Sequence, residues 1–230
     1  MKLRVRTWGE GEHTVLLVHG LAADSGTWHE TACALAEWGH RVVAPDLRGH
    51  GRSPRGYYSP EALASDLVDT LPKGAHLAVG HSFGAAVLAL AAGELAPARL
   101  VYAEPYWNIA AVGELPEAET ANRLMGTEPD EIAAQHPEWP SEAVAAEVEA
   151  RSRWDPRTMV DLHAFDMPCT PDAAEVPSLV LRAELPSAAP ALDEPLLRRR
   201  GFDVATVPGA GHVLHRDRPK AFLAALRPLL

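Results

Sequence analysis

Residues 80–84 read Gly-His-Ser-Phe-Gly and directly follow an apolar run, which places a serine between two glycines. A surface serine needs no glycine two positions away on either side. A chain that turns sharply from a strand into a helix does, because side chains at those positions would collide. The pattern therefore predicts a nucleophile elbow that points Ser82 into a cleft, above a helix N-terminus with free N–H groups. The simpler alternative is a glycine-rich helix start in which Ser82 is an incidental N-cap.

The rest of the chain alternates short β-branched apolar runs with longer stretches rich in alanine and leucine. This alternation is typical of an α/β fold, with a mostly parallel central sheet and helices on both faces. We expect strands over residues 3–8, 14–19, 41–45, 76–80, 100–103, 178–182 and 203–207. We expect helices over residues 25–38, 60–70, 82–95, 129–135, 141–154 and 219–226.

The middle of the chain has a different composition, in which proline, glutamate and alanine dominate and strand signals vanish. A structureless loop of this length is improbable in a compact fold. We therefore expect a core domain over residues 1–104 and 176–230, and an inserted helical cap over residues 105–175.

A serine hydroxyl is a poor nucleophile without an adjacent base, so the elbow predicts a histidine late in the chain. Of the eleven histidines, His212 lies in a glycine-rich loop between the last expected strand and the final helix. Such a loop can present an imidazole at the carboxyl edge of the sheet. His215 is a weaker candidate because it has no glycine hinge beside it. We expect the side chain of His81 to diverge from that of Ser82, because consecutive residues on a sharp turn point apart.

The third requirement is a pair of backbone donors for the tetrahedral oxyanion. The residue after the nucleophile normally supplies one, which here is the Phe83 N–H. The second is expected from the turn His19-Gly20-Leu21-Ala22 at the end of an early strand, where the glycine permits close backbone approach. We assign it to the Leu21 N–H.

With these residues in place, four ordered segments resemble the motifs of the α/β-hydrolase superfamily, namely residues 18–21, 45–53, 80–84 and 208–212. The resemblance extends from one end of the chain to the other and implies the α/β-hydrolase fold. The second segment resembles a loop that is structural in the family. The resemblance therefore implies that Asp46 and Arg48 hold a turn together and have no catalytic role.

The acid of the triad departs from the family pattern. Most members carry an aspartate in the loop after the strand that ends here near Ala183, but the nearest carboxylate in this chain is Glu184. A minority branch, seen in some haloalkane dehalogenases, takes its acid from the end of the preceding strand, and Glu104 resembles that arrangement. We favour Glu104 because a strand end fixes a side chain more firmly than a proline-bounded loop does. A Ser82–His212 dyad without any acid stays open.

The predicted reaction is hydrolysis of a small, largely apolar carboxylic ester or lactone through an acyl-enzyme on Ser82. No metal or organic cofactor is implied. Apolar residues near the elbow and in the cap are expected to line the pocket, although each aromatic could instead belong to a packed core. These residues are Leu21, Trp28, Phe83, Tyr106, Trp107, Trp154, Met159 and Phe165.

Three other functions stay open on the same residues. A non-hydrolytic lyase or cyclase of a biosynthetic pathway would use His212 to move protons and Ser82 only to orient its substrate. An acyl thioesterase would share the elbow, although the acidic surface argues weakly against docking an acidic carrier. A binding protein could keep the fold without turnover.

Composition limits the partners. The formal net charge of −10 disfavours nucleic acids and anionic membranes, which are bound through clustered lysines and arginines. We expect a small-molecule substrate, and a monomer or homodimer. No leader or long apolar segment is recognisable, and Cys33 and Cys169 lie far apart in the sequence. The expected protein is therefore cytoplasmic and free of disulfides.

Overall fold

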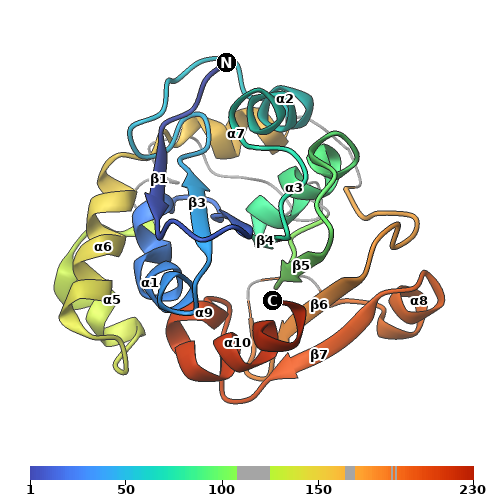
Figure 1. Ribbon diagram of the computed structural model, residues 1–230. Coiled ribbons are helices and arrows are strands. Elements are labelled where there is room, and N and C mark those ends of the chain that lie inside the picture. The colour runs from blue at the N-terminus through green and yellow to red at the C-terminus, as the bar shows by residue number, and fades with distance from the viewer. Residues whose placement is uncertain (108–124, 164–168, 188, 190) are drawn as a thin grey trace.

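The computed structural model describes residues 1–107, 125–163, 169–187, 189 and 191–230. It has a seven-stranded sheet in the order β1-β3-β2-β4-β5-β6-β7 (Figure 1). The strands are β1 (Val5–Trp8), β2 (Thr14–Val18), β3 (Arg41–Pro45), β4 (Leu77–His81), β5 (Leu100–Ala103), β6 (Ser178–Ala183) and β7 (Asp203–Val207). β1 is antiparallel to β3, and the other neighbouring strands are parallel. The expected α/β fold with a mostly parallel sheet is confirmed.

Helices cover both faces of this sheet (Figure 1). The described helices are η1 (Ser25–Trp28), α1 (His29–Glu37), α2 (Pro60–Thr70), α3 (Phe83–Leu95), α5 (Pro129–Gln135), α6 (Ser141–Ser152), α7 (Arg157–His163), α8 (Glu194–Arg199), α9 (Leu214–Asp217), α10 (Pro219–Leu226) and η3 (Arg227–Leu229). In β2, Leu16 and Val18 pack with residues of α2 and α3. Val15 and Leu17 pack with residues of α1 and α10 on the other face. Burial on both faces explains why β2 is apolar at successive positions.

Two helical segments differ from the sequence expectation. The helix expected over residues 25–38 starts as the 3₁₀ turn η1, which the Asp24 carboxylate caps by accepting a hydrogen bond from the Gly26 N–H at 2.7 Å. The helix expected over residues 141–154 ends earlier, and α7 follows as a separate helix. The Asp155 carboxylate accepts a hydrogen bond from the Arg157 N–H at the start of α7, which favours a new helix start there.

The stretch between β5 and β6 contains α5, α6 and α7 in its described part. α5 packs against α6 (Figure 1), and α6 contacts η1. The helical character expected for a cap is therefore present, and we propose that these helices form one. Its limits at residues 105 and 175 stay a prediction.

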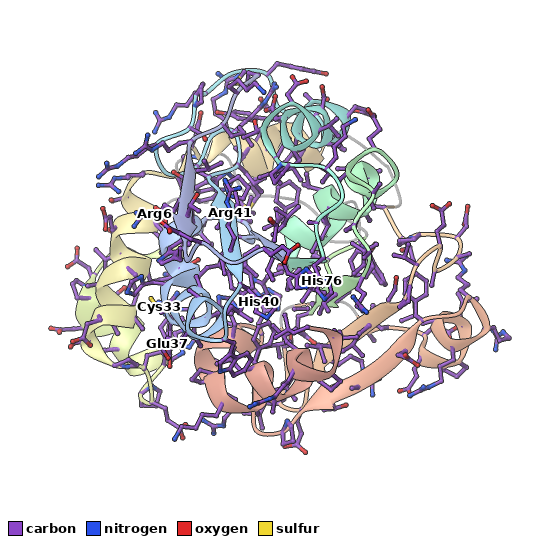
Figure 2. The ribbon with its side chains drawn as sticks, viewed as in Figure 1. Arg6, Cys33, Glu37, His40, Arg41 and His76 are labelled. Carbon is purple, nitrogen blue, oxygen red and sulfur yellow. The ribbon has the colours of Figure 1, made fainter. Side chains whose placement is uncertain are left out.

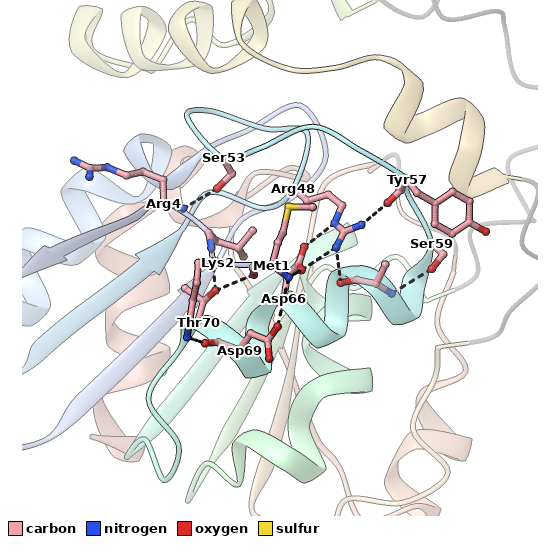
Figure 3. A network of polar contacts seen from close by, with 12 residues as sticks. Met1, Lys2, Arg4, Arg48, Ser53, Tyr57, Ser59, Asp66, Asp69 and Thr70 are labelled. Carbon is pink, nitrogen blue, oxygen red and sulfur yellow. Dashed lines mark hydrogen bonds and ion pairs between the residues drawn. The ribbon is translucent and has the colours of Figure 1, made fainter.

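The loop that follows β3 is held by hydrogen bonds and an ion pair. The Asp46 carboxylate accepts from the Ser25 N–H at 2.9 Å and from the Arg52 N–H at 2.8 Å. Arg48 reaches out of the loop and pairs with Asp66 on α2 at 2.6 Å (Figure 3). Asp46 thus fixes the turn itself, and Arg48 connects the loop to α2. The side chains of Arg48 and Asp66 are both buried.

Two further features concern the cysteines and the length of the apolar helices. No disulfide joins Cys33 to Cys169. Cys33 lies on α1 near Glu37 (Figure 2). Cys169 is buried in the core. Among the helices of the described residues, none is both long enough and apolar enough to traverse a bilayer.

The second glycine of the elbow is required by backbone packing. A Cβ atom on Gly84 would lie 2.7 Å from the Val18 carbonyl oxygen and closer still to that of His19. Since both atoms belong to backbone, they cannot yield as a flexible side chain would. We expect Gly84→Ala to lower the free energy of unfolding by about 3 kcal/mol or more, measured by urea denaturation.

Gly93 provides the matched control because it lies on the same helix, α3, with no atom within 4 Å of an added Cβ. Alanine is the better helix former, so Gly93→Ala should raise the free energy of unfolding by about 0.5–1 kcal/mol. Equal stability of the two variants would contradict the close approach of α3 to the end of β2.

Candidate active site

Ser82 occupies the sharp turn between β4 and α3. Its backbone has φ 51° and ψ −120°, a strained conformation for a residue with a side chain. Three backbone hydrogen bonds hold it. The Ser82 N–H donates to the Ala103 carbonyl at 2.9 Å, and the Ser82 carbonyl accepts from the Ala85 N–H at 3.0 Å and from the Tyr106 N–H at 3.1 Å. A Cβ on Gly80 would lie 2.6 Å from the Cα of Ala85. These features give the strand–turn–helix geometry of an elbow.

The elbow lies where the strand order of the sheet reverses. β2 and β4 are neighbours, but the chain continues from β2 to β3 on one side and from β4 to β5 on the other. The loops after such a pair diverge and leave a crevice at the carboxyl ends of the strands. The turn after β2 and the elbow after β4 therefore flank the same crevice.

The His212 imidazole reaches Ser82, although 130 positions separate them in the chain. Its Nε2 lies 2.9 Å from the Ser82 Oγ. The loop that carries His212 follows β7 and is held at two points. The His212 carbonyl accepts a hydrogen bond from the His81 ring Nε2 at 2.8 Å, and the Gly211 N–H donates to Asp217 at 3.0 Å. His81 also lines the cavity that contains Ser82, and its hydrogen bond to the His212 carbonyl positions the loop of the base.

The carboxylate beside the imidazole is that of Glu104. Its Oε2 lies 3.5 Å from the His212 Nδ1, and its Oε1 accepts the Ala183 N–H at 2.6 Å. The Ser187 hydroxyl donates to Glu104 and lies 3.2 Å from the His212 Nδ1. Burial raises the pKa of Glu104, but interactions with His212, Ser187 and the Ala183 N–H outweigh it and leave the pKa below the usual 4.5. Glu104 is therefore ionised at neutral pH.

Glu184 has a different contact. Its side chain is exposed, and its Oε2 accepts the Gly209 N–H at 2.8 Å. This bond supports the turn at the start of the His212 loop. Of the two candidate acids, the structure brings Glu104 to the imidazole and uses Glu184 to brace the backbone.

The two expected oxyanion donors, the Leu21 and Phe83 N–H groups, belong to the turn after β2 and to the first residue of α3. A Cβ on Gly20 would lie 3.2 Å from the Ser82 Cβ, so the turn after β2 approaches the elbow closely. Leu21 and Phe83 both line the cavity that contains Ser82. Neither backbone N–H has an acceptor among the described residues. Both are therefore available to a negatively charged oxygen.

A cavity of about 450 Å³ opens above Ser82, a volume that suits a small organic molecule. Its described lining includes the expected residues Leu21, Phe83, Tyr106 and Met159. The lining combines a mainly apolar middle with charged side chains at one wall. The remaining lining residues are Gly20, Ala23, Thr27, His81, Ser82, Met125, Glu147, Arg151, Leu162, His212, Val213, His215 and Arg216.

The three tryptophans expected in the pocket pack elsewhere. Trp28 is fully buried between α1 and the sheet and stacks on His215 at 3.9 Å between ring centroids. Trp107 packs edge-on against Tyr102 at 5.3 Å. Trp154 packs against Ala22 behind the cavity wall. None of the three is among the described residues that line the cavity, contrary to the expectation, and Phe165 lies outside the described residues.

Buried histidines next to the site make stability depend on pH. Burial lowers the pKa of His81 to about 3, with a further contribution from His212, and burial also lowers the pKa of His215. Below pH 6.5 the unfolded chain binds protons that the folded chain excludes, so stability falls as pH falls. We expect the free energy of unfolding to drop by about 1 kcal/mol or more per pH unit between pH 6 and pH 4. Urea denaturation at four pH values tests this, and a flat profile would contradict neutral burial.

A sequence model of the alpha/beta hydrolase family matches residues 15–226. The chain belongs to this family. The match extends from β2 to the end of α10 and thus includes the elbow, the Glu104 strand end and the His212 loop. The resemblance that the four motifs indicated is confirmed.

Individual members of the alpha/beta hydrolase family add detail. An epoxide hydrolase of Caballeronia sordidicola is 37% identical over 92 residues, which are 37% of this chain and 28% of that protein. The chain thus spans less than a third of that relative's length. The 2-(acetamidomethylene)succinate hydrolase of Mesorhizobium japonicum is 28% identical over 97% of this chain and 90% of its own. An esterase structure from Exiguobacterium antarcticum, 17% identical, superposes with a TM-score of 0.76 over 98% of this chain and 94% of that one, which shows the shared fold.

Proposed function

We propose that this protein is a serine hydrolase that cleaves a small, largely apolar carboxylic ester or lactone through an acyl-enzyme on Ser82. The observation that carries the proposal is the 2.9 Å contact between the Ser82 Oγ and the His212 Nε2, with ionised Glu104 on the far side of the ring. A serine, an imidazole and a carboxylate in this order are the elements of acyl transfer.

In the first step, the Ser82 Oγ attacks the ester carbonyl carbon while the His212 Nε2 takes the hydroxyl proton. The carbonyl oxygen becomes an oxyanion that accepts hydrogen bonds from the Leu21 and Phe83 N–H groups. The C–O bond to the leaving group then breaks, and the imidazolium returns its proton to the alcohol. Glu104 stabilises the imidazolium and holds the ring through its Nδ1 side.

In the second step, water attacks the acyl carbon and His212 takes its proton. The second tetrahedral oxyanion uses the same two donors. Its collapse releases the carboxylic acid and restores the Ser82 hydroxyl. This sequence needs no metal and no organic cofactor.

The family context supports hydrolysis as the reaction class. The relatives named above are called an epoxide hydrolase, a 2-(acetamidomethylene)succinate hydrolase and an esterase. These names differ in the bond that is cleaved, so the choice of an ester rests on the site. The apolar middle of the cavity, with Leu21, Phe83 and Met159, suits a short acyl chain.

Rapid mixing with 4-nitrophenyl esters of increasing acyl length tests the proposal. We expect a burst of 4-nitrophenolate equal to the enzyme concentration, followed by slower steady turnover. A thioesterase would instead prefer acyl thioesters of the same acyl group. A lyase or cyclase that uses Ser82 only for orientation would give no burst, and neither would a binding protein.

A further inference from the structure

One wall of the active-site cavity carries three charged side chains that the proposed mechanism does not use. Glu147 and Arg151 come from α6, and Arg216 comes from α9, four positions after His212. The Glu147 Oε1 accepts from the Arg151 Nε at 2.8 Å, and its Oε2 pairs with Arg216. A single carboxylate therefore lies between two guanidinium groups.

Among the described residues that line this wall, two arginines and one glutamate leave one positive charge. Asp217 also interacts electrostatically with Arg216, but Asp217 does not line the cavity. Burial lowers the pKa of His81 and of His215, so neither ring adds charge at neutral pH. The chain as a whole has a formal charge of −10, so a positive wall is not a consequence of a basic composition.

Arg151 has a donor with no partner. Its Nε serves Glu147, and its Nη1 donates to the carbonyl groups of Met125 and Gly126. Its Nη2 has no acceptor among the described residues, although only 11% of the side chain is exposed. The Nη2 is not among the fully buried atoms that lack a partner, so it stays accessible from the cavity that Arg151 lines, where a ligand oxygen can accept from it.

Arg216 is firmly held beside it. Its guanidinium lies 3.8 Å from the centroid of the Trp139 ring and also donates to the Ala143 carbonyl. Its side chain is 5% exposed. Both the Glu147 pair and the tryptophan fix its position, so the charge is presented to the cavity at low cost in side-chain entropy.

We propose that the substrate carries a carboxylate at the end remote from the reacting carbonyl, bound by the Arg151 Nη2 in the field of Arg216. This inference rests on the proposed ester hydrolysis and narrows its substrate to monoesters of dicarboxylic acids. The apolar middle of the cavity contacts the methylene chain, and the guanidinium binds the terminal oxygens. The simpler role of the three side chains, an ion-pair tie between α6 and α9, predicts no preference for an anion.

Paired substrates separate the two roles. We compare 4-nitrophenyl hydrogen adipate with 4-nitrophenyl hexanoate, which have the same chain length and differ in the terminal carboxylate. Arg151→Gln should lower kcat/KM for the adipate monoester by about 10- to 100-fold, mainly through KM, and leave the hexanoate within about threefold. Glu147→Gln removes a negative charge beside Arg151, so it should raise the ratio of kcat/KM for the adipate monoester to kcat/KM for the hexanoate above the native ratio.

Arg153→Gln is the matched control. Arg153 is the C-cap residue of α6, the helix that carries Arg151, and it pairs with Glu149 and does not line the cavity. It should leave both rates unchanged. Equal losses on both esters in Arg151→Gln, or no preference of the native enzyme for the adipate monoester, would overturn the proposal.

A binding measurement keeps the inference separate from the proposed function. In Ser82→Ala, calorimetric titration should show monomethyl adipate binding about 10-fold or more tightly than dimethyl adipate. Adding Arg151→Gln should abolish that difference. Equal affinities of the two adipates for Ser82→Ala would overturn the carboxylate site even if esters are hydrolysed. If Ser82→Ala prefers monomethyl adipate but the native enzyme gives no nitrophenolate burst, only the hydrolase proposal is overturned.

Discussion

Ser82→Ala is expected to lower kcat for 4-nitrophenyl butyrate by about 10⁴-fold or more while the protein stays folded. The Oγ is the atom that forms the acyl bond, and no other hydroxyl lies at 2.9 Å from the His212 Nε2 among the described residues. The backbone at this position has φ 51° with either side chain, so alanine introduces no new strain. Steady-state kinetics and circular dichroism measure the two effects.

Ser152→Ala is a suitable control for this variant. Its hydroxyl is exposed at the end of α6 and donates to the Glu149 carbonyl. We expect it to keep kcat within about twofold, because surface substitutions away from a site change little. A Ser82→Ala enzyme that retains a tenth of the native rate would exclude Ser82 as the nucleophile.

Glu104→Gln is expected to lower kcat by about 10³- to 10⁴-fold. Glutamine keeps the size of the side chain, but it cannot stabilise the imidazolium and it disturbs the choice of tautomer. The Ala183 N–H and the Ser187 hydroxyl both donate to this carboxylate. The amide would therefore also leave one of these donors poorly matched. The loss should appear in kcat with little change in KM.

Glu184→Gln is the matched comparison, since both residues follow adjacent strands of the sheet. The Glu184 carboxylate is exposed and accepts only the Gly209 N–H among the described residues. A glutamine oxygen can accept the same bond, so kcat should fall by no more than about threefold. If Glu184→Gln lowered kcat more than Glu104→Gln does, the assignment of Glu104 as the acid would be wrong.

The elbow and the base were predictable because their signals are local. Glycines at positions 80 and 84 are required by contacts with nearby backbone, and each is two positions from Ser82 in the sequence. His212 lies in a loop where Gly209 has φ 68°. This conformation favours glycine, so the glycine itself indicates the turn in the sequence. Strand positions were also readable, because apolar β-branched runs of this length are typical of buried parallel strands.

The acid was harder to predict because its orientation depends on long-range packing. Glu104 has φ 46°, and nothing at that position marks a left-handed turn as a glycine would. Ser187 contacts Glu104 across 83 residues and belongs to no motif, so no signal identified it. The prediction that tryptophans line the pocket differs from the structure for a similar reason. The burial of Trp28 is decided by the packing of α1 and α10 on the sheet, which the neighbouring residues do not encode.

The central claim is that the Ser82 hydroxyl is activated for attack by His212 and not merely placed near it. Intact-mass spectrometry after treatment with a fluorophosphonate tests this most directly. We predict one phosphonate adduct per chain, located on the peptide that contains Ser82 and absent from Ser82→Ala and His212→Ala. A folded native protein that remains unmodified, or one that is modified at another residue, would contradict the account.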